Sequence, residues 1–298
     1  MQSRYAAAVV CLRVAAGLLL GGCAHGGGAT GPGTAQLSLR SGPGLSVDGT
    51  LGGAATEVRL ALEEPRSLLS SRCLGALPAS EVQVRLPALQ GGWQTAPEIP
   101  LTGVTVGGHP LPQFRAAVIS DSSCVLWLGL DVLGRSVVDL DLDARAVNLS
   151  RAAPELPASL EQVQVDISRA PDSDRLLVAA QLTGSTATVL QTLIIATGRG
   201  SELAQFQARL LGAESVVRVV QLAPGWEACD VPVRSRSDWT RAPAIGVLGP
   251  EAWGARRAII DLGASRMTLI RPKGAAPPPC RQIEDVGPAA PSKEREPR

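Results

Sequence analysis

The stretch WLGLDVLGRSVVDLDLDARAVNLSR, from Trp127 to Arg151, decides the fold because it occurs a second time in the chain. The second copy, VLGPEAWGARRAIIDLGASRMTLIR, runs from Val247 to Arg271 at an offset of 120 residues without a gap. Identical or similar residues stand at Leu128/Leu248, Gly129/Gly249, Asp131/Glu251, Gly134/Gly254, Asp141/Asp261, Leu142/Leu262, Ala144/Ala264, Leu149/Leu269 and Arg151/Arg271. Each copy reads as an apolar run, a glycine, a helical turn and two strands joined by a turn. The sequence therefore indicates an internal duplication.

Short strands make up most of the rest of the chain. Runs rich in Val, Leu and Ile, such as FRAAVIS, VQVDIS and RLLVAAQL, alternate with Gly and Pro, which is an all-β pattern. Two short helices are also expected, in PRSLLSSRCLGAL from Pro65 and in SELAQFQARLLGA from Ser201, with Ser201 as N-cap. The segment LSVDGTLGGAATEVRLALEEP parallels LLVAAQLTGSTATVLQTLIIATG, so the duplication extends upstream. We expect two tandem lobes, 39–152 and 160–272, joined by a linker over 153–159.

The ends of the chain predict an export signal and a lipid anchor. Residues 1–22 read as a signal peptide with a short apolar run, and Leu20-Gly21-Gly22-Cys23 resembles a bacterial lipobox, which would make Cys23 the lipidated residue. Residues 23–38 are rich in Gly and read as a flexible tether, and residues 273–298 read as a disordered tail. We therefore expect a protein of the bacterial cell envelope, attached to a membrane through its lipid and without a transmembrane helix.

Composition argues against several classes of function. A net charge of +1 and 3% aromatic residues are poor for nucleic-acid binding. The chain has two histidines, His25 and His109, which are isolated, so neither a metal site nor a Ser-His-Asp triad is expected. Phosphate-binding glycine loops are missing as well, and we expect no cofactor.

The remaining cysteines suggest disulfides. With Cys23 lipidated, the mature chain keeps Cys73, Cys124, Cys229 and Cys280, an even number in an oxidising compartment. Three connectivities are possible for four cysteines. The pairing Cys73–Cys124 and Cys229–Cys280 is favoured, because each bond then stays inside one half of the chain.

This layout resembles the retropepsin-like aspartic peptidase family, in particular its two-lobed bacterial members. Each lobe of that family has a hairpin that runs into Asp-Thr-Gly, and it closes with an apolar-apolar-Gly strand, a helical turn and a final hairpin. The resemblance covers about Leu39 to Arg271, once per lobe, and is most specific in VLWLGLDVLGRSVVDLDLDARAVNL. It implies an all-β fold of two retropepsin-like β-barrel lobes, with a cleft between them that binds extended peptides.

The catalytic signatures of the family are degenerate in this chain. Catalysis needs two carboxylates about 3 Å apart that share a proton and activate a water. The second signature falls on Ala196-Thr197-Gly198, where a methyl group replaces the carboxylate, and the first falls on Glu63-Glu64-Pro65. We expect no catalytic residue, with Glu63 and Ala196 at the degenerate dyad positions. Glu63, Glu64, Thr197 and Gly198 are then expected to line the floor of the cleft.

One further stretch, Asp261-Leu262-Gly263-Ala264-Ser265, differs by one letter from an intact Asp-Thr-Gly-Ala-Ser signature. Its repeat partner is Asp141, late in lobe 1, and only 33 residues follow Ser265, which is too few for the rest of a lobe. We interpret the stretch as a hairpin turn in which the aspartate has a structural role.

Three functional hypotheses follow. The leading one is an inactive lipoprotein with aspartic-peptidase architecture that binds an extended peptide or a protein partner in the cleft between the lobes, or serves as a scaffold. An alternative is an active aspartic-type endopeptidase that uses Glu63 with another carboxylate, through homodimerisation for example. Another alternative is an unrelated β-sandwich that serves as a structural lipoprotein of the envelope. An internal two-fold and the carboxylates at the lobe interface distinguish these hypotheses.

Overall fold

The computed structural model describes residues 35–39, 44–75, 82–88, 92–134, 136–213, 215–239, 246–274 and 280. The predicted signal peptide, Cys23, most of the predicted tether and most of the predicted tail lie outside these residues. The chain divides into two units, Met1–Pro32 and Gly33–Arg298, and every described residue belongs to the second. Within the described ranges, no helix is long and apolar enough to cross a membrane.

The fold is all-β with two lobes, as the sequence predicts. The strands of the described residues form one sheet of nine and one of thirteen. The nine-stranded sheet belongs to lobe 1 and has the order β5-β6-β9-β4-β10-β3-β2-β7-β8. Its strands are β2 (Ser46–Leu51), β3 (Ala54–Leu60), β4 (Leu68–Ser70), β5 (Gln83–Pro87), β6 (Trp93–Leu101), β7 (Val104–Val106), β8 (His109–Pro110), β9 (Phe114–Ile119) and β10 (Val125–Leu128). Lobe 1 also contains the short helices η1 (Ser71–Cys73) and α1 (Leu130–Leu133).

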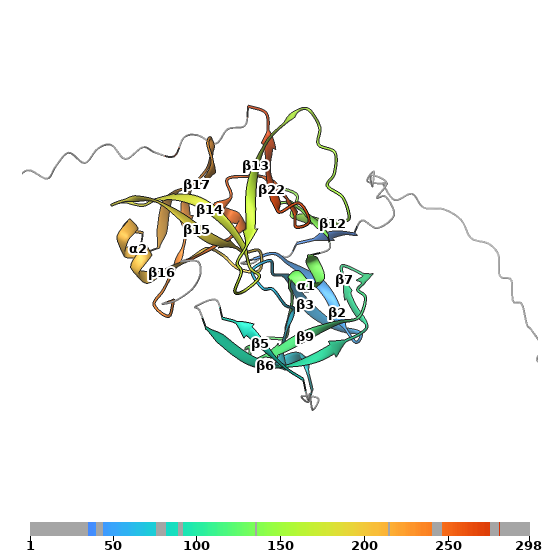
Figure 1. Ribbon diagram of the computed structural model, residues 1–298. Coiled ribbons are helices and arrows are strands. Elements are labelled where there is room, and N and C mark those ends of the chain that lie inside the picture. Colours follow the sequence, from blue (N-terminus) through green and yellow to red (C-terminus); the bar gives the residue numbers. More distant parts are fainter. Residues whose placement is uncertain are drawn as a thin grey trace, which may run out of the picture. The chain divides into compact units, whose positions relative to one another are not determined.

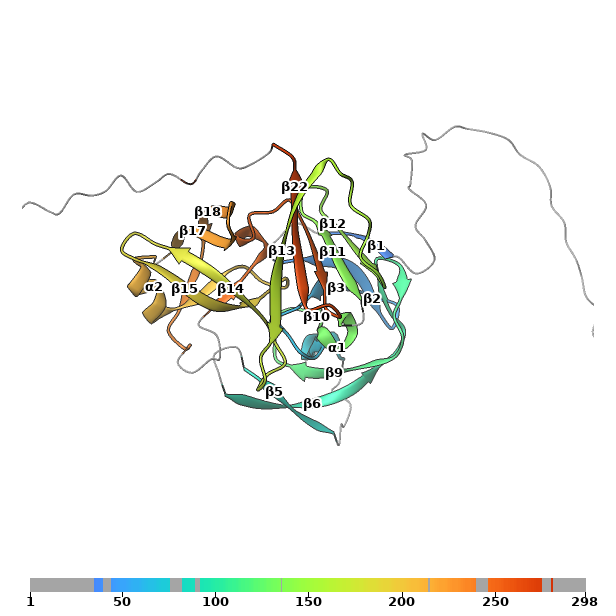
Figure 2. The ribbon, with the colours of Figure 1, turned by 45° about the horizontal axis from the view of Figure 1, so that its top comes forward.

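The thirteen-stranded sheet begins with six strands that the two lobes share (Figure 1). In spatial order they are β1 (Ala35–Ser38), β12 (Ala146–Ser150), β11 (Val137–Asp141), β21 (Arg257–Asp261), β22 (Arg266–Pro272) and β13 (Leu160–Arg169). Figure 2 shows β12 beside β11 and β22 beside β13, and β21 lies between these two pairs in the sheet. The predicted tether over 23–38 is therefore wrong at its end, because residues 35–38 pair with β12 and complete the edge of this sheet.

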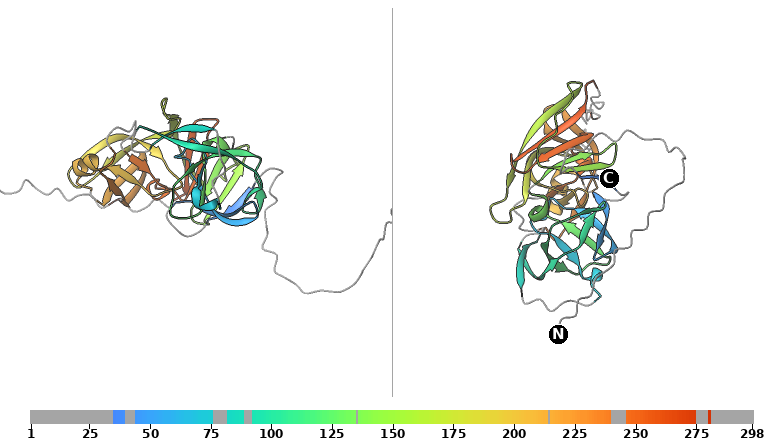
Figure 3. Two further views of the ribbon diagram at one scale, coloured as in Figure 1. Left: turned by 90° about the horizontal axis from the view of Figure 1, so that it is seen from below. Right: turned by 90° about the vertical axis from the view of Figure 1, so that its right-hand side faces the viewer.

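The rest of the thirteen-stranded sheet belongs to lobe 2, which Figure 3 shows from two further sides. Its elements are β14 (Leu176–Thr183), β15 (Thr188–Ile195), β16 (Glu202–Ala204), α2 (Gln205–Leu211), β17 (Val216–Ala223), β18 (Trp226–Pro232), β19 (Arg234–Arg236), β20 (Gly246–Leu248) and η2 (Pro250–Ala252). The strand β14 shows why such segments form strands. Every second side chain, from Leu176 to Leu182, is apolar and buried in the core, as the two-residue period of a β-strand requires.

An internal two-fold relates the lobes in the shared sheet. The closing strands β11 and β21 pair antiparallel, with Val137 opposite Asp261 and Asp141 opposite Arg257. Because Val137 corresponds to Arg257 and Asp141 to Asp261 in the repeat, exchanging the two lobes maps each of these pairs onto the other. The local axis passes through the central pair, Asp139 and Ile259. The duplication read from the sequence is thus a symmetric arrangement in space.

Asp261 is the last residue of β21 and holds the turn that leads to β22, which confirms its structural interpretation. Its Oδ1 accepts a hydrogen bond of 2.9 Å from the amide of Ala264, and Asp141 accepts one of 2.7 Å from Ala144 in the equivalent turn. Each turn then has a residue with positive φ, 52° at Ser265 and 50° at Arg145. In both copies the aspartate stabilises the turn by accepting a backbone hydrogen bond.

Replacing Asp261 by Ala is expected to lower the free energy of unfolding by about 1 kcal/mol, the usual contribution of one such hydrogen bond. Urea denaturation measures the change. The matched control is Asp172→Ala, which removes an exposed carboxylate that makes no hydrogen bond among the described residues. Equal effects of the two substitutions would contradict the structural role of Asp261.

The helix predictions are partly wrong. The stretch from Pro65 forms β4 and only one turn of η1, because β4 lies between β9 and β10 in the lobe 1 sheet and tertiary pairing outweighs its local preference. The second helix exists as α2, but it begins after Ala204, and Ser201 is not its N-cap. Gly212, with φ of 63°, ends α2 in the left-handed conformation.

Both favoured disulfides are present. Cys73 is bonded to Cys124 and Cys229 to Cys280, each over a sequence separation of 51 residues. One bond fastens η1 to the segment before β10 in lobe 1. The other fastens Cys280, from the predicted tail, to β18 in lobe 2. The prediction that each bond stays inside one half of the chain is confirmed.

Candidate functional site

The two loops that follow β3 and β15 meet at the seam between the lobes. In lobe 1, β3 pairs parallel with β10, and the amide of Ala61 donates to the carbonyl of Leu128 at 2.9 Å. In lobe 2, β15 pairs parallel with β20, and the amide of Ala196 donates to the carbonyl of Leu248 at 3.0 Å. Leu128 and Leu248 are equivalent in the repeat, so Ala61 is the structural counterpart of Ala196.

This register corrects the predicted alignment of lobe 1. The counterpart of the Ala196-Thr197-Gly198 signature is Ala61-Leu62-Glu63, two residues before the predicted Glu63-Glu64-Pro65. Glu63 is therefore not the counterpart of Ala196, and the two equivalent positions, 61 and 196, both carry a methyl group. The correct alignment could have been found by matching the apolar ends of the two strands, because Leu60-Ala61 in lobe 1 corresponds to Ile195-Ala196 in lobe 2.

Thr197 connects the lobes through its side chain and its backbone. Its hydroxyl accepts a hydrogen bond of 3.0 Å from the amide of Leu62 and donates one of 2.6 Å to the carbonyl of Leu60. Its own carbonyl accepts from the amide of Leu45 at 2.5 Å. The side chain is fully buried. Thr197 thus has a structural role at the seam and does not line an open cleft.

The carboxylate of Glu63 crosses the seam from lobe 1 and is held there by donors from lobe 2. Its Oε2 accepts from the amides of Thr197 at 3.0 Å and Gly198 at 3.2 Å, and Arg199 donates to its Oε1 at 3.3 Å. A Cβ at position 198 would lie 2.7 Å from that Oε1, so a larger residue there would displace the carboxylate of Glu63. The side chain of Glu63 is 0% exposed, which leaves no room for a hydrolytic water on these atoms.

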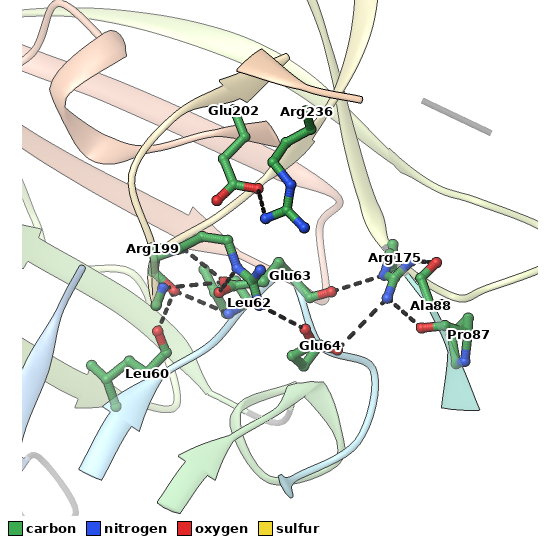
Figure 4. A network of polar contacts seen from close by, with 12 residues as sticks. Leu60, Leu62, Glu63, Glu64, Pro87, Ala88, Arg175, Arg199, Glu202 and Arg236 are labelled. Carbon is green, nitrogen blue, oxygen red and sulfur yellow. Dashed lines mark hydrogen bonds and ion pairs between the residues drawn. The ribbon is translucent and has the colours of Figure 1, made fainter. Parts of the chain in front are cut away.

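Glu63 belongs to a buried ionic group that we call the seam cluster, formed by Glu63, Glu64, Arg175 and Arg199 (Figure 4). Arg199 bridges the two glutamates, and its Nη2 lies 3.2 Å from Oε1 of Glu64. The other oxygen of Glu64 lies 3.7 Å from Arg175. Two carboxylates are thus matched by two guanidinium groups, so that neither buried charge is left without a counter-ion.

Arg175 also fixes the hairpin of β5 and β6 to lobe 2. Its guanidinium donates to the carbonyl of Pro87, the last residue of β5, at 2.5 Å and to that of Ala88, the next residue, at 3.0 Å. It also donates to the carbonyl of Glu63 at 3.0 Å. The side chain is 1% exposed. One buried arginine therefore joins the hairpin, the lobe 1 seam loop and the start of β14.

Burial and charge act in opposite directions on the ionisation of the cluster. Burial raises the pKa of Glu64 to about 7, although Arg199 and Arg175 favour its charged form. Burial alone would lower the pKa of Arg199, but Glu63 and Glu64 outweigh it and the pKa is raised. In Arg175 burial prevails over the attraction of Glu64, and its pKa is lowered.

The pKa of Glu64 makes stability depend on pH. Between pH 4.5 and about 7 the folded protein binds this proton more tightly than the unfolded chain, so the contribution of Glu64 to stability is fully present below pH 4.5 and is lost as pH rises through 7. The expected decrease is on the order of 3 kcal/mol. Urea denaturation at a series of pH values measures it, and Glu64→Gln is expected to flatten the slope in this window. An unchanged slope in Glu64→Gln would contradict this assignment.

Two pockets lie next to the seam loops. One, of about 580 Å³, is lined by Gly198, Arg199 and Gly200 of lobe 2 together with Glu251. The other, of about 530 Å³, is lined by Pro65, Arg66 and the hairpin residue Trp93 together with Asp131. Because Asp131 and Glu251 are equivalent in the repeat, the pockets lie at related places in the two lobes. Of the four residues predicted to line the cleft, only Gly198 lines either pocket, and Glu63, Glu64 and Thr197 are buried.

The equivalence of Asp131 and Glu251 extends to their hydrogen bonds. The hydroxyl of Ser67 donates to Asp131 at 2.8 Å and accepts from the amide of Gly129 at 3.1 Å. In lobe 2, Ser201 donates to Glu251 at 2.7 Å and accepts from Gly249 at 2.9 Å. These serines fasten the segment after each seam loop to the apolar-Gly strand. The N-cap assignment of Ser201 missed this role, which depends on a residue 50 positions away.

The equivalent positions 61 and 196 present two methyl groups at the seam, and the seam cluster lies beside them. Among the described residues, no group of His, Cys, Asp and Glu side chains is placed to hold a metal ion. The sequence matches no known family model and no curated protein.

Proposed function

We propose that this protein is a catalytically inactive relative of the retropepsin-like aspartic peptidases, lipid-anchored through Cys23 in the bacterial cell envelope, which binds a peptide segment of a partner protein next to the seam. The observation that carries the proposal is the equivalence of Ala61 and Ala196 at the dyad positions. A methyl group neither accepts nor donates a proton, so water cannot be activated there.

The arrangement of the acidic residues favours this proposal over an active peptidase. Glu63 and Glu64 do meet at the seam, but they come from the same lobe and Arg199 bridges them. The charge of Glu63 is stabilised by two amides and a guanidinium, and its side chain is inaccessible to water. The two-fold pairing of β11 with β21 weighs against the alternative of an unrelated β-sandwich.

The seam cluster also restricts the positions at which a peptide could bind. Arg175 and Glu64 fill the space between the β5–β6 hairpin and the seam loop, so an extended ligand lying on the dyad positions would have to displace a buried ion pair. The pockets beside the cluster are open to ligands. We therefore place the peptide in a pocket next to the seam, where main-chain pairing and side-chain contacts can provide affinity.

Affinity capture with a diverse peptide library tests this function. The full-length protein is immobilised and incubated with the library, and the retained peptides are identified by mass spectrometry. We expect a selected set of intact peptides. Retention no greater than on a blank surface would contradict the binding proposal, and retained fragments would contradict the lack of activity.

A further inference from the structure

The larger of the two pockets has an unusual charge arrangement. Its lining includes three arginines, Arg59, Arg199 and Arg234, and two glutamates, Glu202 and Glu251. We call it the arginine pocket. The remaining lining is small or apolar, from Gly44, Gly198, Gly200, Ser201, Pro232 and Val233. A Cβ at Gly44 would clash with the backbone of Gly198, so the two seam segments approach closely at the edge of this pocket.

Both glutamates of the pocket are already occupied by protein partners. Oε1 of Glu251 accepts from the amide and the hydroxyl of Ser201, each at 2.7 Å. Glu202 is paired with Arg236, which does not line the pocket, at 3.3 Å. Among the described residues, neither carboxylate makes a hydrogen bond or an ion pair with an arginine of the pocket, although the charge of Glu202 raises the pKa of Arg199.

The positive charges and N–H donors of the three arginines are less completely satisfied by protein partners. Arg199 faces Glu63 and Glu64 but keeps 30% of its side chain exposed. Arg59 uses its Nε for Glu57 at 2.8 Å and stacks over Trp127 at 5.9 Å from the ring centroid, while its terminal nitrogens make no hydrogen bond among the described residues. Arg234 is exposed and has neither a hydrogen bond nor an ion pair from its side chain within the described ranges. Guanidinium donors in this pocket remain available to a ligand.

We propose that the arginine pocket binds a carboxylate of an acidic peptide, with Arg234 as the principal contact. This rests on the proposed peptide-binding function and specifies the chemistry of its ligand. A planar guanidinium pairs with a carboxylate through two parallel hydrogen bonds, which makes arginine the preferred partner of such groups. Pro232 and Val233 offer apolar surface to the methylene groups of a glutamate side chain. A glutamate within the peptide or a free C-terminus could supply the carboxylate.

Calorimetric titration of the full-length protein with three short peptides of equal length tests this proposal. The first contains glutamates and has an amidated C-terminus, the second replaces each glutamate by glutamine, and the third is the glutamine peptide with a free C-terminus. At least one carboxylate-bearing peptide is expected to bind about tenfold or more tightly than the neutral one, and the one that does so identifies the source of the carboxylate. Arg234→Gln is expected to remove this preference.

The control is Arg218→Gln, which removes an exposed arginine on β17 outside the pocket and is expected to leave the affinity unchanged. Equal affinity for all three peptides would overturn the arginine-pocket proposal while leaving peptide binding intact. If Arg218→Gln and Arg234→Gln lowered the affinity for the carboxylate-bearing peptide equally, the arginine-pocket proposal would also be overturned. Non-specific attraction to positive charge would then explain the preference. If none of the three peptides binds in calorimetry and the library capture retains no peptide above the blank, the proposed function itself is overturned.

Discussion

Arg175→Met is expected to lower the free energy of unfolding by about 4 kcal/mol, the typical cost of removing one partner from a buried ion pair. The substitution leaves Glu64 without its second arginine and deprives the carbonyls of Glu63, Pro87 and Ala88 of a donor. Methionine keeps much of the apolar volume, so the loss reports on the charge and the hydrogen bonds. Urea denaturation measures it.

The matched control is Arg169→Met, whose arginine forms an exposed pair with Asp174 at 3.0 Å. Exposed pairs of this kind contribute about 0–1 kcal/mol, so a small effect is expected. Hydrogen exchange gives a second readout, since Arg175→Met should speed the exchange of amides in β5 and β6 before those of the shared sheet. An effect of Arg175→Met as small as that of Arg169→Met would show that the seam cluster does not hold the hairpin.

Removing one disulfide is the other change with a large expected effect. Cys73→Ala with Cys124→Ala opens a loop with a sequence separation of 51 residues, and chain entropy gives a loss of about 4 kcal/mol. Cys229→Ala with Cys280→Ala opens a loop of the same separation in lobe 2, so a similar loss is expected. Thermal or urea unfolding of the two double variants against the parent measures both effects.

The two disulfides also differ in what they fasten, which provides a further check. Cys73 follows β4 in lobe 1, whereas Cys280 lies beyond β22, the last strand among the described residues, and is bonded to Cys229 of lobe 2. Proteolysis near residue 280 should therefore become faster only in the lobe 2 variant. A loss below about 1 kcal/mol in either double variant would contradict the entropic role of that bond.

The fold could be predicted from the sequence largely because the chain repeats itself. The ungapped match of Trp127–Arg151 with Val247–Arg271 indicated the symmetric closing hairpins, and the same match identified Asp261 as a turn residue. The disulfides followed from keeping each bond inside one half of the chain. The edge strand β1 was missed because its pairing with β12 depends on residues more than a hundred positions away.

The candidate site was less predictable, since it depends on register and long-range contacts. Because Glu63-Glu64 is acidic, the sequence suggested Glu63 as the lobe 1 counterpart of Ala196. The pairing at the strand ends shows that the counterpart is Ala61, two residues earlier. Arg175 and Arg199 carried no local signal, because each meets the glutamates across more than 100 residues of sequence. The seam cluster became visible only when the loops were brought together.

The seam cluster gives Thr197 and Gly198 a structural role at the contact between the lobes. Thr197 and Gly198 retain positions that hold the lobes together, and Glu63 uses their amides as its donors. A buried ionic group is weak evidence for added stability, but it tolerates the loss of a partner poorly.

The most direct test of the central claim, that the seam holds no working pair of carboxylates, is a cleavage assay. The full-length protein and its Glu63→Gln variant are incubated with a diverse peptide library between about pH 3 and pH 8, the range over which carboxylate dyads titrate. Mass spectrometry measures the products. We expect no cleavage above background from either protein at any pH. Cleavage by the parent protein that disappears in Glu63→Gln would contradict the claim.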